Sequence, residues 1–373
     1  MNIIHIVEPF AAGIAVFVKS LTVSMPDDVH IIIHGERIKI MPAHEVKQNF
    51  TKKNIRFIRW RSAQRAIDPV KDAFALSELY TVLRRLKRKG LVDAVHLHSS
   101  KSGLLGRLAC RLAGIDNVIY TPNGAPFLSA GNRIQRYFYQ QMEKLGDRLG
   151  GQVVCCSVSE YNEYQKLGIK AVYINNGVSV QKAQEFADQQ TDSIFRVVTS
   201  GRIEAQKQPA LFNAIAAYFE DMSAIQFTWI GDGPDQHQFT SRNIHVTGWL
   251  DTPSVQKVVA GADLYLSTSK YEGLSFAVLE AMALCKPMLL TNCTGNSDIV
   301  KKGINGALFT TKGEAILKIL NYYNNPQMLS VMGGYSVEIC KKEFDVQHNF
   351  KNYRDVYSGS VFSAIKNEKW KFG

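Results

Sequence analysis

The sequence predicts an α/β protein of two domains, each built on a parallel β-sheet with helices on both faces. Two observations carry this prediction. The chain has 373 residues, which is long for a single ordinary core. Apolar runs of strand length also alternate with helical patterns through both halves of the chain. The polar stretch 181–193 between the halves is the predicted linker.

The first half begins with a strand and repeats a strand–helix alternation. We expect strands at 2–7, 29–34, 54–59, 92–97, 117–121, 152–156 and 169–174. Helical patterns fill the gaps, at 14–24, 73–89, 102–113 and 133–149. Because helices connect successive strands, the strands are expected to run parallel. Residues 1–180 therefore form the first predicted domain.

The second half repeats the same order of elements. We expect strands near 195–199, 225–230, 243–247, 263–268, 287–291 and 306–309. The expected helices lie near 208–220, 252–260, 275–285 and 313–323. This pattern predicts a second domain over 181–343, followed by a helical tail over 344–373. Both domains are thus expected to be Rossmann-like.

Charge is distributed unevenly between the halves. Residues 1–180 hold 25 Lys and Arg against 14 Asp and Glu, whereas residues 181–373 hold 19 of each. The excess concentrates near Lys52–Arg65, at Arg84–Lys89 and at Arg133–Tyr139. Such a face attracts an anionic membrane surface, although a solvated helix surface with no partner is the plain alternative. Nucleic acid ranks last, because no nucleic-acid-binding motif accompanies the charge.

Other features bound the location of the protein. The N-terminus is predicted to be a strand rather than a leader peptide, and no apolar stretch reaches the ~20 residues of a membrane helix. The six cysteines show no zinc spacing and are expected to be reduced. We therefore expect a cytoplasmic protein, peripheral at the inner face of the membrane, with no metal site.

Two glutamates, Glu272 and Glu280, are separated by seven residues at a predicted strand–glycine–helix junction. Gly273 lets the backbone approach a ligand closely. Backbone amides of Leu274, Ser275 and Phe276 are donors at a helix N-terminus, which suits a phosphate group. A carboxylate on each side of this phosphate site can accept hydrogen bonds from hydroxyl groups. Glu280 is expected to accept those of a ribose. The arrangement indicates a nucleotide-sugar site, although such a spacing of glutamates by itself is common.

A second candidate element is Ser200–Gln208, which follows a predicted strand and precedes a helix. Arg202 and Lys207 lie five residues apart across a turn, so both can reach one diphosphate. Two cations there would neutralise a leaving diphosphate without a metal ion. The alternative for Arg202 is a salt bridge to Glu204.

The glutamate spacing and the Gly-Arg-x4-Lys run resemble those of retaining glycosyltransferases of the family 4 type, which have a GT-B fold. The resemblance covers nearly the whole chain. It implies that residues 1–180 bind the acceptor, that residues 181–343 bind the nucleotide-sugar across a central cleft, and that the C-terminal helix crosses back to the first domain. Glu272, Arg202 and Lys207 would then be catalytic, with no cofactor besides a UDP-sugar donor.

Further motifs extend the resemblance. In Trp229–Pro234, Gly231 is expected beside the nucleotide, and Trp249 near its base. In the first half, Gly13 stands where the family has a glycine-rich loop, and His98 and Lys101 lie in a run typical of polysaccharide-biosynthesis members, on the acceptor side. Asn123 replaces a histidine that the family usually places next to the donor sugar. Asparagine can hydrogen-bond there but cannot carry a proton.

The expected function is transfer of a hexose-type sugar from a nucleotide diphosphate to a lipid-linked or oligosaccharide acceptor in surface polysaccharide synthesis. Two alternatives share the fold. One is a nucleotide-sugar 2-epimerase, which requires paired acid/base carboxylates that the first half does not show. The other is an inactive glycan-binding homologue, which Asn123 would explain.

Overall fold

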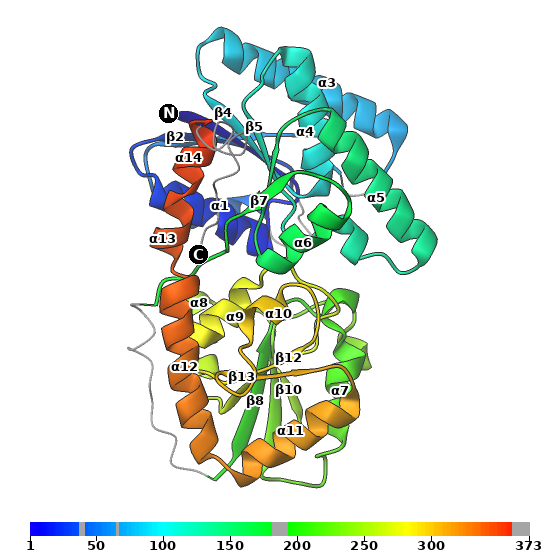
Figure 1. Ribbon diagram of the computed structural model, residues 1–373, viewed down its shortest axis with the longest axis vertical. Helices are drawn as coiled ribbons and strands as arrows, with labels where there is room; N and C mark the ends of the chain where they lie inside the picture. The colour runs from blue at the N-terminus through cyan, green and yellow to red at the C-terminus, as the bar shows by residue number, and fades with distance from the viewer. Residues whose placement is uncertain (37–41, 65–66, 181–192, 360–373) are drawn as a thin grey trace. The chain divides into compact units, whose positions relative to one another are not determined.

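The computed structural model describes residues 1–36, 42–64, 67–180 and 193–359. The chain forms two compact units (Figure 1). The first contains Met1–Asn176 and the segment from Val346 onward, and the second contains Gly177–Asp345. The end of the predicted C-terminal segment, 360–373, and most of the predicted linker lie outside the described residues.

The first unit has a seven-stranded parallel sheet in the order β3-β2-β1-β4-β5-β6-β7. Its strands are β1 (Asn2–Val7), β2 (Val29–His34), β3 (Ile55–Arg59), β4 (Ala94–His98), β5 (Val118–Thr121), β6 (Gln152–Cys155) and β7 (Ala171–Tyr173). Its helices are α1 (Ala12–Ser24), α2 (Ala43–Gln48), α3 (Pro69–Arg88), α4 (Ser100–Ala113), α5 (Arg133–Arg148), α6 (Val158–Lys166), α13 (Val346–Lys351) and α14 (Tyr353–Tyr357).

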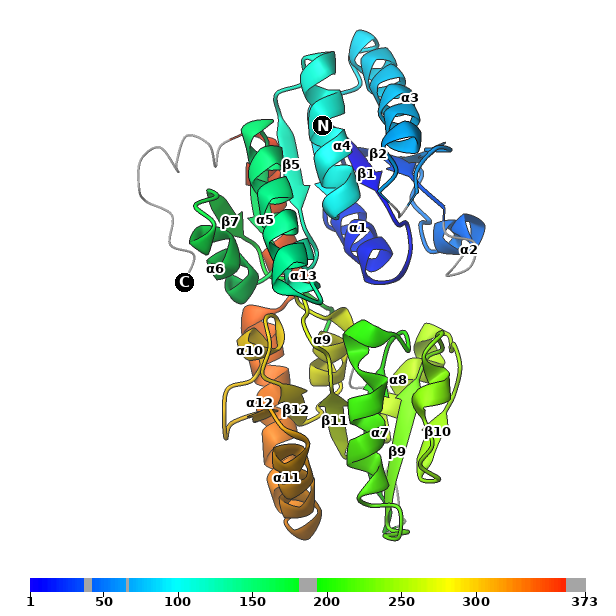
Figure 2. The same cartoon turned by 90° about the vertical axis from the view of Figure 1, so that its right-hand side faces the viewer.

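The two faces of this sheet are covered by different helices. Side chains alternate along a strand, so Ile4 and Ile6 point to one face and His5 to the other. The isoleucine face packs on α3, α4 and α6, with Leu79 in the same core. On the opposite face α13 lies against α1 (Figures 1 and 2), and Phe17 of α1 contacts Phe350. The segment after Val346 thus completes the core of the first unit.

The second unit has a six-stranded parallel sheet in the order β10-β9-β8-β11-β12-β13. Its strands are β8 (Phe195–Ser200), β9 (Ile225–Ile230), β10 (Ile244–Val246), β11 (Leu264–Ser267), β12 (Met288–Thr291) and β13 (Gly306–Phe309). Its α-helices are α7 (Pro209–Ala217), α8 (Thr252–Ala260), α9 (Phe276–Ala283), α10 (Asn296–Ile299), α11 (Lys312–Asn324) and α12 (Gln327–Glu343). The predicted pair of Rossmann-like sheets is therefore confirmed.

Local differences from the prediction have physical causes. Helix α3 begins at Pro69, four residues before the expected start, because Asp68 accepts a capping hydrogen bond from the Lys71 amide and proline suits the first turn. The described part of the predicted tail, 344–359, contains two short helices, α13 and α14. They are separated from α12 by a break at which the Phe344 carbonyl accepts a hydrogen bond from the Val178 amide and Asp345 pairs with Val178.

Candidate functional site

The junction between β11 and α9 brings Glu272 to the carboxyl edge of the second sheet. Its amide donates to the Thr294 carbonyl at 3.0 Å, which fixes the backbone. The side chain of Ser275, at the N-cap of α9, makes no capping hydrogen bond. The N–H groups of the first helical turn are therefore left to water or to a ligand. The predicted strand–glycine–helix geometry is present.

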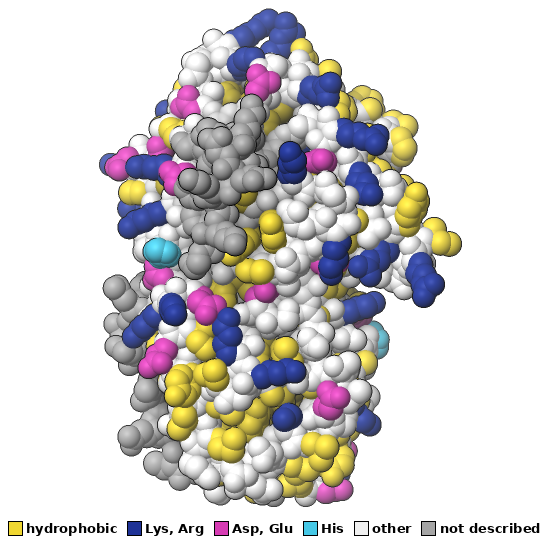
Figure 3. Space-filling model, in the orientation of Figure 1, with side chains coloured by type: hydrophobic (Ala, Val, Ile, Leu, Met, Phe, Trp, Pro, Cys, Tyr) yellow, Lys and Arg dark blue, Asp and Glu magenta, His cyan; other side chains and the backbone are white. Residues whose placement is uncertain are grey.

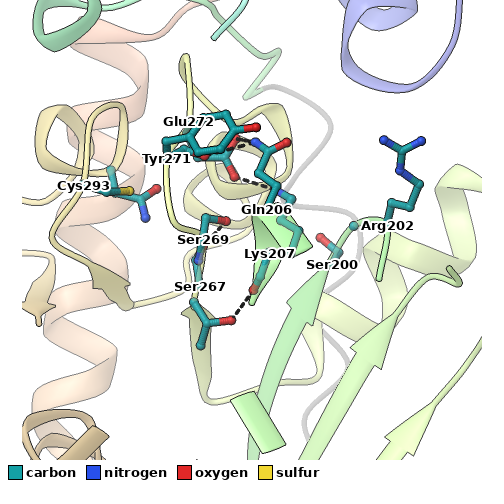
Figure 4. A network of polar contacts seen from close by, with 12 residues as sticks. Ser200, Arg202, Gln206, Lys207, Ser267, Ser269, Tyr271, Glu272 and Cys293 are labelled. Atoms are coloured by element: carbon teal, nitrogen blue, oxygen red, sulfur yellow. Dashed lines mark hydrogen bonds and ion pairs between the residues drawn. The ribbon is translucent and has the colours of Figure 1, made fainter. Parts of the chain in front are cut away.

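The Glu272 side chain is largely buried, at 7% exposure, and is paired with Lys207. Lys207 Nζ lies 2.6 Å from Glu272 Oε1 (Figure 4). Burial tends to lower the pKa of the Lys207 amine, but the Glu272 carboxylate more than offsets this, so that pKa is raised above its usual value. Lys207 is consequently charged at neutral pH, and the two predicted catalytic residues form one ion pair.

Gln206 is a neighbour that the sequence did not indicate. Its Nε2 donates to the Tyr271 carbonyl at 3.0 Å and lies 3.5 Å from Glu272 Oε2. The Lys270 amide donates back to the Gln206 carbonyl. These bonds join the Ser200–Gln208 segment to the glutamate segment, so the two predicted elements form one site within the second unit.

Arg202 does not join this ion pair. Its Nη2 lies 2.6 Å from Glu204, and the side chain extends away from Lys207 and Glu272 (Figure 4). The salt bridge to Glu204, which was the alternative interpretation of Arg202, is therefore the contact present here. The side chain is partly exposed, at 26%, and starts from the same loop as Lys207.

Glycines allow the Arg202 loop to pack against the end of β9. A Cβ on Gly231 would stand 2.2 Å from the Gly201 carbonyl oxygen, and one on Gly233 would stand 2.2 Å from that of Ile203. No side chain fits either position. Gly231 also bridges to Gly248, which places the half-exposed Trp249 next to this loop. The tryptophan face is thus accessible to a planar ligand.

Glu280 lies on α9, on the exposed part of a helix whose other faces are mostly buried. Although its side chain remains open to solvent, the surrounding protein desolvates the carboxyl and raises its pKa to about 7. Such a carboxyl changes charge near neutral pH. A ligand that donates hydrogen bonds to it would favour the charged form.

The four candidate site residues of the first unit differ in their exposure and contacts. Gly13 is exposed in the first turn of α1, where a loop was expected. Lys101 pairs with Asp72 at 2.5 Å, and His98 is fully buried. Asn123 has a φ of 55°, a left-handed conformation that asparagine tolerates. Because His98 cannot reach the surface, we do not retain it as an acceptor contact.

Glu160 holds the turn that carries Asn123. This fully buried carboxylate accepts from the Gly124 amide at 2.8 Å and from the Cys156 amide at 2.9 Å. Burial raises the pKa of Glu160. Ser157 caps α6 through the Glu160 amide, so the Ser-x-x-Glu pattern was the available sequence signal.

A chain of buried histidines crosses the first sheet. The Met25 carbonyl can only accept, so His30 donates Nε2–H to it, and the Nδ1 of neutral His30 then accepts from His5 Nε2. His5 Nδ1 accepts in turn from His98 Nε2 at 3.2 Å. His5, His96 and His98 are close enough to share a metal ion, but both nitrogens of His5 already have hydrogen-bond partners. We assign the chain a structural role.

Sequence comparisons match both halves of the chain. The family described as Glycosyltransferase Family 4 matches residues 11–182, and the family described as Glycosyl transferases group 1 matches residues 194–325. An Escherichia coli UDP-Gal:alpha-D-GlcNAc-diphosphoundecaprenol alpha-1,3-galactosyltransferase is 26% identical over 330 residues, covering 80% of this chain and 82% of its own length. A Salmonella typhimurium lipopolysaccharide 1,6-galactosyltransferase is 27% identical, covering 57% of this chain and 64% of its own.

Solved structures show the same fold. Sucrose-phosphate synthase from Thermosynechococcus elongatus has a TM-score of 0.78 at 15% identity, with 98% of this chain and 100% of that chain covered. Anabaena Alr3699/HepE in complex with UDP and glucose has a TM-score of 0.73 at 16% identity, with 98% and 99% covered. At these identities the likeness establishes the arrangement of the elements alone.

Proposed function

From the premise that the chain is a group 1 glycosyltransferase of the family 4 type with a GT-B fold, we propose that it transfers a sugar from a UDP-sugar to a lipid-linked or oligosaccharide acceptor. The product would belong to a surface polysaccharide or lipopolysaccharide. The two galactosyltransferases similar to this chain support this class of reaction. The similar structure with bound UDP supports the choice of nucleotide.

The Lys207–Glu272 ion pair at the start of α9 is the observation that carries the proposal. Lys207 would turn from Glu272 to the donor diphosphate, which would also accept from the amides of Ser275 and Phe276, with the Gly273–Leu274 backbone close by. Glu272 would then accept sugar hydroxyls and Glu280 the ribose hydroxyls. Trp249 would stack on the base, with Gly231 beside the nucleotide.

Arg202 would complete the diphosphate site by exchanging Glu204 for a phosphate oxygen. Both partners are anionic, and the guanidinium is partly exposed, so the exchange keeps its charge paired. In the first unit, Asn123 would face the donor sugar, with Gly13 near the donor and Lys101 on the acceptor side.

The proposed reaction retains the configuration at the anomeric carbon. The bond from that carbon to the diphosphate breaks, and the bond to the acceptor oxygen forms on the same face. The departing phosphate oxygen takes the proton of the acceptor hydroxyl, so no protein base is required. Cations at the diphosphate stabilise the charge that develops on it.

We also propose that the enzyme works at an anionic membrane surface, on the cytoplasmic face where lipid-linked acceptors would present their sugars. No helix among the described residues has the length and apolar character to cross a bilayer. The excess of 25 basic over 14 acidic residues in the first 180 positions supports attachment through the first unit.

Purified protein is expected to release UDP and to form a glycolipid when supplied with UDP-hexoses and an undecaprenyl-diphosphate-linked acceptor. Activity should survive a strong chelator, because the cationic side chains and the helix N-terminus neutralise the diphosphate. Product chromatography, with and without chelator, would measure UDP release and glycolipid formation. NMR of the anomeric proton would show the configuration of the new bond. An epimerised UDP-sugar formed without acceptor, or no reaction with any UDP-, GDP- or ADP-sugar, would refute the proposal.

Affinity for UDP is expected to rise between pH 6 and pH 8. Glu280 has a pKa of about 7, and its charged form would accept the ribose hydroxyls, so binding weakens as the carboxyl is protonated. Glu280→Gln should weaken UDP binding by about 1.5–3 kcal/mol at pH 8. Calorimetry at several pH values would measure both effects.

The phosphate groups of UDP also titrate, but they do so equally with parent and variant. The exposed Glu338→Gln change in the same unit serves as the matched control and should leave UDP affinity unchanged. If Glu280→Gln binds UDP as tightly as the parent at every pH, Glu280 does not contact the nucleotide.

A further inference from the structure

Helix α5 packs on the first unit with its apolar side facing solvent. Its fully buried positions are Glu143 and Gly146. Large apolar side chains are instead exposed to solvent, with Ile134 at 84% and Tyr137 at 64%. A surface helix of a globular protein normally buries its apolar stripe. The core accounts for the buried Glu143 carboxylate, which accepts hydrogen bonds from the Tyr120 and Tyr164 hydroxyls at 3.0 Å each. Nothing in the core accounts for the apolar side chains that face water.

The exposed apolar residues share one face of the helix. At about 100° per residue, positions 134, 137, 138 and 145 fall within an arc of about 100°. Phe138 is 46% exposed and Leu145 is 47% exposed. Position 141, in the middle of the arc, is an uncharged glutamine. The stripe thus runs along most of the helix without a charged residue.

Basic residues flank this stripe. Arg133 and Lys144 lie on one side of it, and Arg148 falls in line with the stripe at the C-terminal end of the helix. Arg136 faces further round and pairs with Glu163. In Figure 3, hydrophobic and basic side chains alternate along the right-hand margin, over the region where Figure 1 draws α5. A strongly amphipathic helix with a basic flank is typical of a helix lying in a membrane interface.

Helix α3 extends this surface on the same face of the sheet, beyond α4. Ile67, Val70 and Phe74, at and just before its N-terminal end, are each 67% exposed and are spaced for one side of the helix. Its C-terminal end carries the exposed arginines Arg84 and Arg85. Because the helices follow parallel strands, the N-terminal ends of α3 and α5 both lie at the carboxyl edge of the sheet.

We propose that α5 docks in the interface of a bilayer containing anionic lipid, inserting Ile134, Tyr137 and Phe138 between the headgroups while Arg133, Lys144 and Arg148 contact lipid phosphates. The proposal rests on the proposed function insofar as a lipid-linked acceptor requires the enzyme at a membrane. It goes further by naming the docking element and by assigning part of the attachment to apolar insertion, which salt does not screen. Charge complementarity favours a lipid surface over a second copy of this basic face, since two copies would repel one another.

The test compares three proteins by sedimentation with phosphatidylcholine vesicles, with and without phosphatidylglycerol. The α5 variant carries Ile134→Ser, Tyr137→Ser and Phe138→Ser. The control variant carries Leu317→Ser, Val331→Ser and Tyr335→Ser, three exposed apolar residues on helices of the second unit. Circular-dichroism melts verify that each variant is folded, and UDP calorimetry verifies that it keeps the donor site of the second unit.

The parent and the control variant are expected to bind anionic vesicles and to retain a measurable fraction of that binding at 1 M salt. The α5 variant should lose that salt-resistant fraction, with at least a ~10-fold weaker partition, while binding UDP as the parent does. Equal partition of the α5 variant and the parent would overturn the proposal. So would a parent dimer that the α5 substitutions dissociate in sedimentation analysis, because the stripe would then bind a second copy.

The outcomes are distinguishable from failure of the proposed function. UDP release in the acceptor assay reports on the transferase, whereas vesicle partition reports on α5 in the absence of any sugar donor. Replacing Tyr137 with tryptophan adds a direct probe, because brominated lipids should quench its fluorescence if the side chain inserts. An unquenched Tyr137→Trp protein that still sediments with vesicles would refute insertion.

Discussion

Lys207→Ala is expected to lower turnover by about 10²–10³-fold, the cost of losing one group that stabilises charge in the transition state. The charge on the diphosphate grows as the sugar departs, so the loss should appear mainly in kcat rather than in UDP affinity. The variant also leaves the largely buried Glu272 carboxylate without its partner at 2.6 Å. UDP release measured at saturating donor would quantify the effect.

Arg202→Ala should also lower turnover, because the partly exposed guanidinium would leave Glu204 for the same diphosphate. Lys270→Ala is the matched control, since Lys270 is exposed and lies two residues from Glu272. It should turn over at the parental rate. If the Arg202→Ala, Lys207→Ala double variant also does so, the diphosphate binds elsewhere.

The free energy of unfolding is expected to fall steeply as the pH drops below about 6.5. Burial lowers the pKa of His5, His96 and His98 well below the usual value, so these side chains stay neutral in the folded protein. In the unfolded chain they take up protons below about pH 6.5. Each fully buried histidine then costs about 1.4 kcal/mol per pH unit until its lowered pKa is reached.

Three such residues give a slope of about 4 kcal/mol per pH unit, which is large against the ~5–15 kcal/mol stability of a typical domain. Glu143 and Glu160 oppose it, because burial raises the pKa of each and the folded protein takes up their protons first. Urea titrations at pH 5.5, 6.5 and 7.5 would measure the slope.

His5→Gln should reduce the slope by about 1.4 kcal/mol per pH unit, the share of one proton. The variant's stability at pH 7.5 provides the reference for this comparison. A parent protein equally stable at pH 7.5 and pH 5.5 would contradict the assignment of neutral buried histidines.

Strands and the glutamate junction were predictable because their signals are local. A run such as Leu264–Ser267 is mostly apolar and buried throughout, as expected for a strand covered on both faces, and Gly273 marks the turn into α9. The contacts of the site depend on chain segments far apart in sequence. The pairing of Lys207 with Glu272 joins positions 65 residues apart. The sequence therefore indicated a cationic and an anionic site residue, but not that the two form an ion pair.

His98 illustrates why the acceptor side was harder to predict. A histidine at a strand end resembles an accessible polar residue in sequence. Its burial follows from register, since β4 lies beside β1 with His98 opposite Val7 and His96 opposite His5. Only that alignment brings the imidazoles within hydrogen-bonding distance. For α5, the sequence indicated that the basic segment Arg133–Tyr139 suits an anionic membrane, but not that its apolar side is exposed. The periodicity is the same whether the apolar side faces a core or a membrane.

The return of the chain to the first unit at Val346 has a consequence for biosynthesis. Phe350, Tyr353 and Tyr357 are fully buried there, and Tyr357 hydrogen-bonds His96 at 2.7 Å. A ribosome makes the second unit before it makes these residues, so the histidine-bearing face of the first sheet emerges with α1 but without α13 and α14. At ~5–20 residues per second this nascent face stays open for on the order of 10–30 s. The contiguous second unit can complete its fold during that interval, so the unit begun first is the one finished last.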